Sequence, residues 1–230
     1  LRTFDRVLAN PPFSLKSWGY DVWVNGDKFG RDRYGCPPKS YGDLAFVQHM
    51  VASLKQDGKL GVVLPHGILF RGGAEGRIRE GMLKDDLIEA VIGLAPNLFY
   101  GAGIPACIVI IRKNKPAERK GKVLFVNGVE QFVEGKAQNH LSADNVAVLA
   151  KAFHDYANLD RLARVVPMAE IANNDHNLNI SRYVHVTEDT EDLDVAEEVE
   201  KLLELREQRD AAEAKMMGFL KELGYVPEGA

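Results

Sequence analysis

Short apolar runs alternate with helical patterns through the first half of the chain. One helix is predicted over 44–56, where apolar residues recur at helical spacing between a cap at Asp43 and a stop at Gly58. A second helix is predicted over 75–84, after a glycine-rich turn. The apolar runs that predict strands cover 4–9, 60–64, 87–94, 104–112 and 123–127. This alternation predicts an open, mostly parallel α/β sheet, in which 104–112 could form an antiparallel edge.

The pattern changes beyond residue 128. Ser142 is placed to cap a helix that runs to Tyr156, and a short helix is expected from Pro167 to Ala172. A long charged helix follows over 194–223. Its apolar positions form two series at spacings of seven, broken by one arginine: Leu202, Arg209, Met216 and Leu223, then Leu205, Ala212, Phe219 and Val226. We therefore expect three regions, at 1–127, 128–187 and 188–230.

Composition narrows the class of protein. The chain has 230 residues, 46% hydrophobic and 27% charged, which is typical of a globular protein and excludes wholesale disorder, collagen and a disulfide scaffold. No apolar stretch is long enough to span a membrane, and the two cysteines lie far apart, so we expect a reducing, cytoplasmic compartment. The net charge of −4 combines a body at +5 with an acidic region at −9 from residue 188 onwards.

The most specific motif is Asn10-Pro11-Pro12-Phe13, at the end of the first predicted strand. A planar amino nitrogen is a poor nucleophile because its lone pair is delocalised into the ring. An amide oxygen from Asn10 and a carbonyl oxygen from Pro11 could accept its two hydrogens and aim the lone pair at a methyl donor. The prolines stiffen the loop and Phe13 offers a stacking face. A Pro-Pro turn that merely closes a strand is the alternative.

Basic residues interleaved with aromatic residues follow the motif. Lys28, Arg31, Arg33 and Lys39 lie in a loop of about 30 residues, a length that is often functional, and they suit contacts to nucleic acid. Arg71 and Arg77 flank the glycine-rich turn and are candidates for contacts to a DNA backbone. A mobile surface loop and a simple tight turn are the alternatives. The six histidines show no metal-ligand spacing, so no metal site is expected.

The segment FDRVLANPPF resembles the catalytic motif of amino-group DNA methyltransferases that use S-adenosylmethionine. Four further segments resemble the modification subunit of type I restriction–modification systems: 37–50 (PPKSYGDLAFVQHM), 61–79 (GVVLPHGILFRGGAEGRIR), 91–115 (VIGLAPNLFYGAGIPACIVIIRKNK) and 177–184 (NLNISRYV). This resemblance implies that Asn10, Pro11, Pro12 and Phe13 form a motif that methylates adenine at N6. It also implies a flipped adenine in double-stranded DNA, a specificity subunit and a restriction subunit as partners.

The resemblance further implies a partial Rossmann-like methyltransferase sheet, comprising strands four to seven, followed by a C-terminal helical region. The family's glycine motif for S-adenosylmethionine lies upstream of the Asn-Pro-Pro-Phe motif, so we expect part of a longer polypeptide that is inactive alone. Two other functions stay open. The chain could act through its C-terminal helix as a docking module, or it could belong to a methyltransferase for protein glutamine or RNA guanine.

Overall fold

The structure, a computed structural model, describes residues 1–99, 103–185 and 195–225. The chain forms two units, Leu1–Val186 and Thr187–Ala230, which are described separately below. Among the described residues, no helix is both long enough and apolar enough to cross a membrane.

The first unit is built on a six-stranded sheet in the order β1-β2-β4-β3-β5-β6. β1 pairs with β2 in parallel, as β3 does with β5, whereas β4 and β6 are antiparallel to their neighbours. The predicted α/β sheet is thus confirmed. The antiparallel strand near 104–112 lies inside the sheet rather than at its edge, because β4 inserts between β2 and β3. The strands are β1 (Phe4–Ala9), β2 (Leu54–Pro65), β3 (Ile88–Leu94), β4 (Ala106–Arg112), β5 (Lys122–Gly128) and β6 (Ala163–Pro167).

The helices of this unit are α1 (Tyr20–Trp23), α2 (Asp43–Ala52), α3 (Gly73–Lys84), α4 (Ala143–Asp155) and α5 (Met168–Asn173), with 3₁₀ turns η1 (His66–Leu69), η2 (Ala117–Arg119) and η3 (Ile180–Arg182). Two expectations need correction. α2 ends before residue 56, because Leu54 already pairs with Phe4 at the start of β2. β6 and α1 were not predicted. The expected cap of α4 is present as a reciprocal pair of bonds between Ser142 and Asn145.

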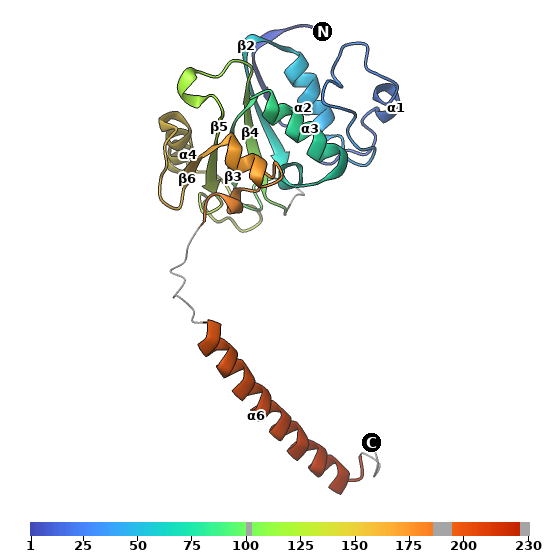
Figure 1. Ribbon diagram of the computed structural model, residues 1–230, viewed down its shortest axis with the longest axis vertical. Helices are drawn as coiled ribbons and strands as arrows, with labels where there is room; N and C mark the ends of the chain where they lie inside the picture. The colour runs from blue at the N-terminus through green and yellow to red at the C-terminus, as the bar shows by residue number, and fades with distance from the viewer. Residues whose placement is uncertain (100–102, 186–194, 226–230) are drawn as a thin grey trace. The chain divides into compact units, whose positions relative to one another are not determined.

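Two apolar cores lie on opposite faces of the sheet. On one face α2, α3 and α5 cover the sheet, and Figure 1 shows α2 and α3 in front of the strands. On the other face α4 packs over β3 and β5 through Leu149 and Ala152. Alternate residues of β3, such as Val91 and Ile92, enter different cores because successive strand residues point to opposite faces.

A buried carboxylate fastens the strands to the segment around η2. Glu89 in β3 is fully buried, and its Oε1 lies 3.0 Å from Arg119 and 3.5 Å from Arg112. The Arg119 guanidinium also lies 4.2 Å above the Tyr156 ring, so this one side chain joins β3, η2 and the end of α4. Burying a carboxylate away from water costs free energy unless cations and hydrogen bonds compensate its charge. Arg119 therefore has a structural role.

We predict that Arg119→Ala lowers the free energy of unfolding by about 3–5 kcal/mol, because it leaves Glu89 buried with only its longer contact. The matched control is Arg164→Ala, which breaks an ion pair to Glu170 whose two side chains are 41% and 33% exposed. That change should cost less than about 1 kcal/mol. Urea denaturation followed by circular dichroism measures both values, and equal losses would contradict the structural role.

Candidate active site

The pairing of β1 with β2 places the Asn-Pro-Pro-Phe motif at one edge of the sheet. The two strands run in parallel from Phe4 opposite Leu54 to Ala9 opposite Val62. Asn10 therefore leaves the sheet at the edge where β1 and β2 both end. β4 begins at this same edge, since Ala106 lies opposite Pro65. Carboxyl ends of parallel strands are where open α/β sheets bind ligands.

Two acceptor groups of the motif have no hydrogen-bond partner among the residues that the structure describes. Asn10 is exposed and Pro11 is half-buried. Within the described parts of the chain, nothing hydrogen-bonds to the Asn10 side chain or to the Pro11 carbonyl. Most carbonyl and amide oxygens near a core find a partner. The two predicted acceptors are thus available to an incoming donor.

Phe13 is held beside a second aromatic ring that sequence reasoning did not select. Its ring meets that of Phe99 edge-on, with centroids 5.8 Å apart and an interplanar angle of 68°. Phe99 lies in the segment after β3, so the contact joins two carboxyl-end loops. Edge-to-face contacts of this kind orient rings, which leaves Phe13 fixed but only half-buried.

The chain turns sharply directly after Phe13. Ser14 has a φ of 52°, a left-handed conformation that is unusual for a residue other than glycine. Its N–H donates a hydrogen bond of 2.8 Å to Oδ1 of Asp43. The expectation that Asp43 caps the helix was wrong: Gly42 is the N-cap, no side-chain cap bond is made, and Asp43 is the first helical residue. Its carboxylate instead binds the backbone that follows the motif.

Arg71, a predicted DNA contact, lies against this region. Its guanidinium carbon is 4.1 Å from the centre of the Tyr41 ring, and its Nη1 is 3.6 Å from Oε1 of Glu75. Burial raises the pKa of Glu75, and the nearby Asp43 raises it further, whereas Arg71 opposes both effects. The second candidate from this segment, Arg77, lies on α3 and is exposed.

Two of the loop bases have carboxylate partners. Arg31 is bound by Asp27, whose pKa is lowered well below its usual range by the hydrogen bond from the Arg31 guanidinium. Arg33 lies 2.7 Å from Asp85. The other two bases are exposed over aromatic rings: Lys28 lies 5.0 Å from the ring centre of Phe29, and Lys39 lies 5.9 Å from that of Tyr20.

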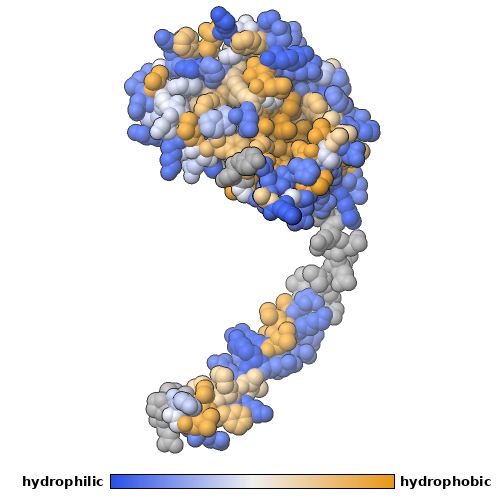
Figure 2. Space-filling view, turned by 180° about the vertical axis from the view of Figure 1, so that it is seen from behind, coloured by the Kyte–Doolittle hydropathy of each residue, from blue (hydrophilic) through white to orange (hydrophobic). Residues whose placement is uncertain are grey.

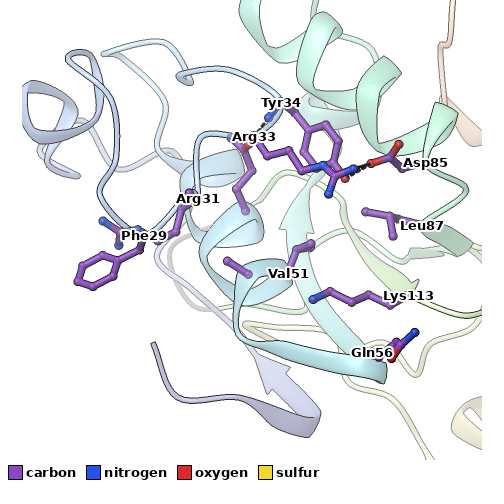
Figure 3. Close-up of a pocket in the computed structure, with 12 residues that line it drawn as sticks. Phe29, Arg31, Arg33, Tyr34, Val51, Gln56, Asp85, Leu87 and Lys113 are labelled. Atoms are coloured by element: carbon purple, nitrogen blue, oxygen red, sulfur yellow. Dashed lines mark hydrogen bonds and ion pairs between the residues drawn. The ribbon is translucent and has the colours of Figure 1, made fainter.

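A pocket of about 660 Å³ lies at the opposite edge of the sheet from Asn10 (Figure 3). Its walls include Gln56 near the start of β2, Leu87 before β3 and Lys113 after β4. Arg33 and Asp85 face each other at its rim, as Figure 3 shows. Burial lowers the pKa of Lys113, and the charge of Arg33 lowers it further. Arg31 and Arg33 line this pocket and therefore lie away from the Asn10–Phe13 motif.

Part of one sheet face is left uncovered beside β1. Leu8 is 87% exposed, and Val63, Ile108 and Ile110 on β2 and β4 are only half-buried. Figure 2 shows an apolar area on this side of the first unit, behind the sheet as seen in Figure 1. Contiguous apolar surface of this kind marks an interaction site.

No group of three or more His, Cys, Asp or Glu side chains that could hold a metal ion occurs within residues 1–99, 103–185 and 195–225. His66, at the carboxyl edge of the sheet, uses its Nε2 in a 3.0 Å hydrogen bond with the Ala106 carbonyl oxygen, and burial lowers its pKa.

Residues 1–192 match the family described as N-6 DNA methylase. The chain belongs to this family. It is 39% identical over 224 residues to the type I restriction enzyme MjaVIII methylase subunit of Methanocaldococcus jannaschii, covering 95% of this chain and 38% of that protein. It is 30% identical over 237 residues to the HindI methylase subunit of Haemophilus influenzae, covering 97% of this chain and 52% of that protein. The N-6 DNA methylase chain thus spans about two fifths to one half of these relatives.

Solved structures agree with the N-6 DNA methylase assignment. The methyltransferase subunit of a type I restriction–modification system from Streptococcus thermophilus superposes with a TM-score of 0.70 at 38% identity, over 80% of this chain and 39% of that one. The EcoKI M protein superposes with a TM-score of 0.63 at 18% identity, which shows the shared fold. The α/β architecture of the first unit is therefore that of the Streptococcus thermophilus methyltransferase subunit.

Proposed function

We propose that this chain supplies the part of a type I modification subunit that binds and orients the adenine amino group for N6 methylation of DNA. The observation that supports this most strongly is the pair of unused acceptors, the Asn10 amide oxygen and the Pro11 carbonyl oxygen, at the carboxyl edge of β1. Both belong to the Asn-Pro-Pro-Phe motif, which lies within the residues that match the N-6 DNA methylase family.

The proposed chemistry needs positioning more than a strong base. The two oxygens accept the two amino hydrogens, so the nitrogen becomes more tetrahedral and its lone pair points away from the ring plane. S-adenosylmethionine, when bound, supplies the methyl group. Phe13, braced by Phe99, offers a face on which an adenine flipped out of the duplex can stack.

Basic residues near the motif are proposed to hold the DNA backbone. Lys39 lies over Tyr20, whose ring also packs edge-on against Trp18 in the segment just after the motif, and Arg71 and Arg77 lie near the start of α3. Lys28 lies further along the same loop. Sequence recognition is assigned to a specificity subunit and cleavage to a restriction subunit, as the resemblance to type I modification subunits implies. For Arg31 and Arg33, contact with DNA stays a prediction.

We predict that Asn10→Ala in a complete modification subunit containing this chain lowers kcat for methyl transfer by about 10²–10³-fold, because one oriented acceptor is lost. The measurement is transfer of labelled methyl groups to duplex DNA, with the product identified by mass spectrometry as N6-methyladenine. Asn114→Ala is the matched control. Asn114 is an exposed residue whose side-chain amide donates a hydrogen bond to Asp57, at the end of the strands opposite Asn10. Retained activity in Asn10→Ala would contradict the assignment. Transfer of the label to protein glutamine or RNA guanine, when these are offered in place of DNA, would favour the alternative acceptors.

The cofactor site is proposed to be completed by residues outside this chain's sheet. The chain contributes Asn10 to Phe13, but β1 forms one edge of the sheet, with Leu8 exposed and the adjoining face uncovered. The pocket of about 660 Å³ lies at the opposite end of the strands. A further α/β segment that pairs with β1 would cover this face and provide the groups for the methionine and ribose parts of S-adenosylmethionine.

This proposal predicts that the 230-residue chain alone binds S-adenosylmethionine with a Kd above about 1 mM. The binding free energy is then less favourable than about −4 kcal/mol. The complete modification subunit should bind it at least about 100-fold more tightly. Isothermal titration calorimetry compares the two. Micromolar binding by the chain alone would show that its own residues form the site.

A second role is proposed for the second unit. Helix α6 (Val195–Glu222) exposes apolar side chains at heptad spacing: Leu202, Leu205 and Phe219 are 64%, 61% and 54% exposed. Val226, the last expected member of the series, lies outside the described residues. An exposed apolar stripe on a charged helix fits a helical partner, which we propose to be the specificity subunit.

We predict that Leu202→Ser combined with Leu205→Ser and Phe219→Ser weakens co-purification of the modification subunit with its specificity subunit by at least tenfold. The matched control replaces Glu200, Glu207 and Glu213 of the same helix with serine and should retain binding within about threefold, since exposed charges contribute little. Unchanged binding of both triple variants, or of a subunit ending at residue 187, would refute the docking role.

A further inference from the structure

The two ends of the segment from Ser14 to Asp43 are hydrogen-bonded to each other. Besides the bond from Ser14 to Asp43, the Gly42 N–H donates to the Leu15 carbonyl oxygen at 3.0 Å. Trp18 packs directly on Gly42, where a Cβ would come within 2.6 Å of the Trp18 side chain. The residues that follow Phe13 are thus fastened to the first residues of α2, and the intervening segment returns to its starting point.

One side chain where these two ends meet stands out. Asp43 is fully buried, and its carboxylate accepts a hydrogen bond from the backbone N–H of Ser14, the first residue after the motif. A hydrogen bond to a charged acceptor is stronger than a neutral one, and the N-terminus of α2 stabilises negative charge at this position. The bond therefore offsets the strain of the left-handed conformation of Ser14.

The direction of the chain at Ser14 determines how Phe13 leaves the motif. If Ser14 relaxed to an ordinary conformation, the backbone on either side would rotate, and the Pro11 carbonyl and the Phe13 ring would lose their present orientation. Arg71 and Glu75 support the same place from the other side, through the contact of Arg71 with Tyr41. Asp43 thus lies between the motif and the packed body of the unit.

We propose that Asp43 is the positioning residue of the Asn10–Phe13 motif, acting through its hydrogen bond to the Ser14 N–H. The inference rests on the proposed function, since it assigns to Asp43 the alignment of the methyl-accepting site. Asp43 touches neither substrate nor cofactor in this role. We therefore expect Asp43 to affect kcat for methyl transfer rather than the binding of S-adenosylmethionine.

The first experiment uses the 230-residue chain and NMR of the Ser14 amide. In the wild type this amide should be shifted downfield and protected from hydrogen exchange. Asp43→Ala should abolish the protection, whereas Asp43→Asn should keep most of it, because the amide oxygen still accepts the bond. Asp85→Ala is the matched control: Asp85 fastens the same segment through Tyr34 at the opposite edge, with a 2.6 Å bond from the Tyr34 hydroxyl.

The second experiment measures methyl transfer by the complete modification subunit. Asp43→Ala should lower kcat by about 10- to 100-fold with the KM for S-adenosylmethionine changed less than about twofold, as expected when a reacting group is misplaced. Asp43→Asn should restore kcat to within about threefold of wild type, and Asp85→Ala should leave it unchanged.

Three results would overturn the inference: a protected Ser14 amide in Asp43→Ala, an unchanged kcat in that variant, or a lost kcat in a folded Asp43→Asn whose Ser14 amide stays protected. If Asp43→Ala fails to fold, the Asn variant and the amide measurement decide. A wild-type subunit that methylates no adenine refutes the proposed function instead, and the NMR experiment still separates the two failures.

Discussion

β1 pairs with β2 in parallel, and the position of every group at the site follows from that pairing. It carries Asn10 to the carboxyl edge, where the chain must leave the sheet and where no further strand bond claims its polar atoms. Proline at the next two positions removes backbone N–H groups that would otherwise compete for nearby acceptors. A strand end with two prolines thus becomes a place where carbonyl and amide oxygens stay unpaired.

The buried ion pairs around β3 lie away from this edge and serve the fold. Glu89 is buried between two arginines, and Lys115 is buried against Asp86, both toward the edge where β3 begins. Buried charged side chains can mark active sites, but here they are paired cations and anions that hold loops to strands. The candidate active site instead relies on neutral acceptors, which suits a reaction that needs orientation of an amino group rather than a shifted pKa.

The elements with local signals were predictable from sequence, and those set by distant contacts were not. β1, α3 and the cap at Ser142 each follow from nearby residues. Helix α2 was predicted to run to Gln56, yet Lys55 and Gln56 lie in β2, because β1 supplies a partner for Leu54. The same holds for the site. The Asn-Pro-Pro-Phe motif was recognisable, whereas the roles of Asp43 and Phe99 depend on folding that brings them beside it. Arg31 was predicted as a free base, but Asp27, four residues earlier, binds it.

The two apolar surfaces differ in what they require. The uncovered face beside β1 adjoins an open strand edge, with unpaired backbone groups and an 87% exposed Leu8. Such an edge is a template for strand pairing, and a partner that pairs with β1 would protect it from unwanted association. The apolar stripe of α6 has no open backbone, since a helix satisfies its own, and acidic residues surround it. The first surface therefore fits a partner that adds a strand to the sheet, and the second fits a partner that packs a helix against α6.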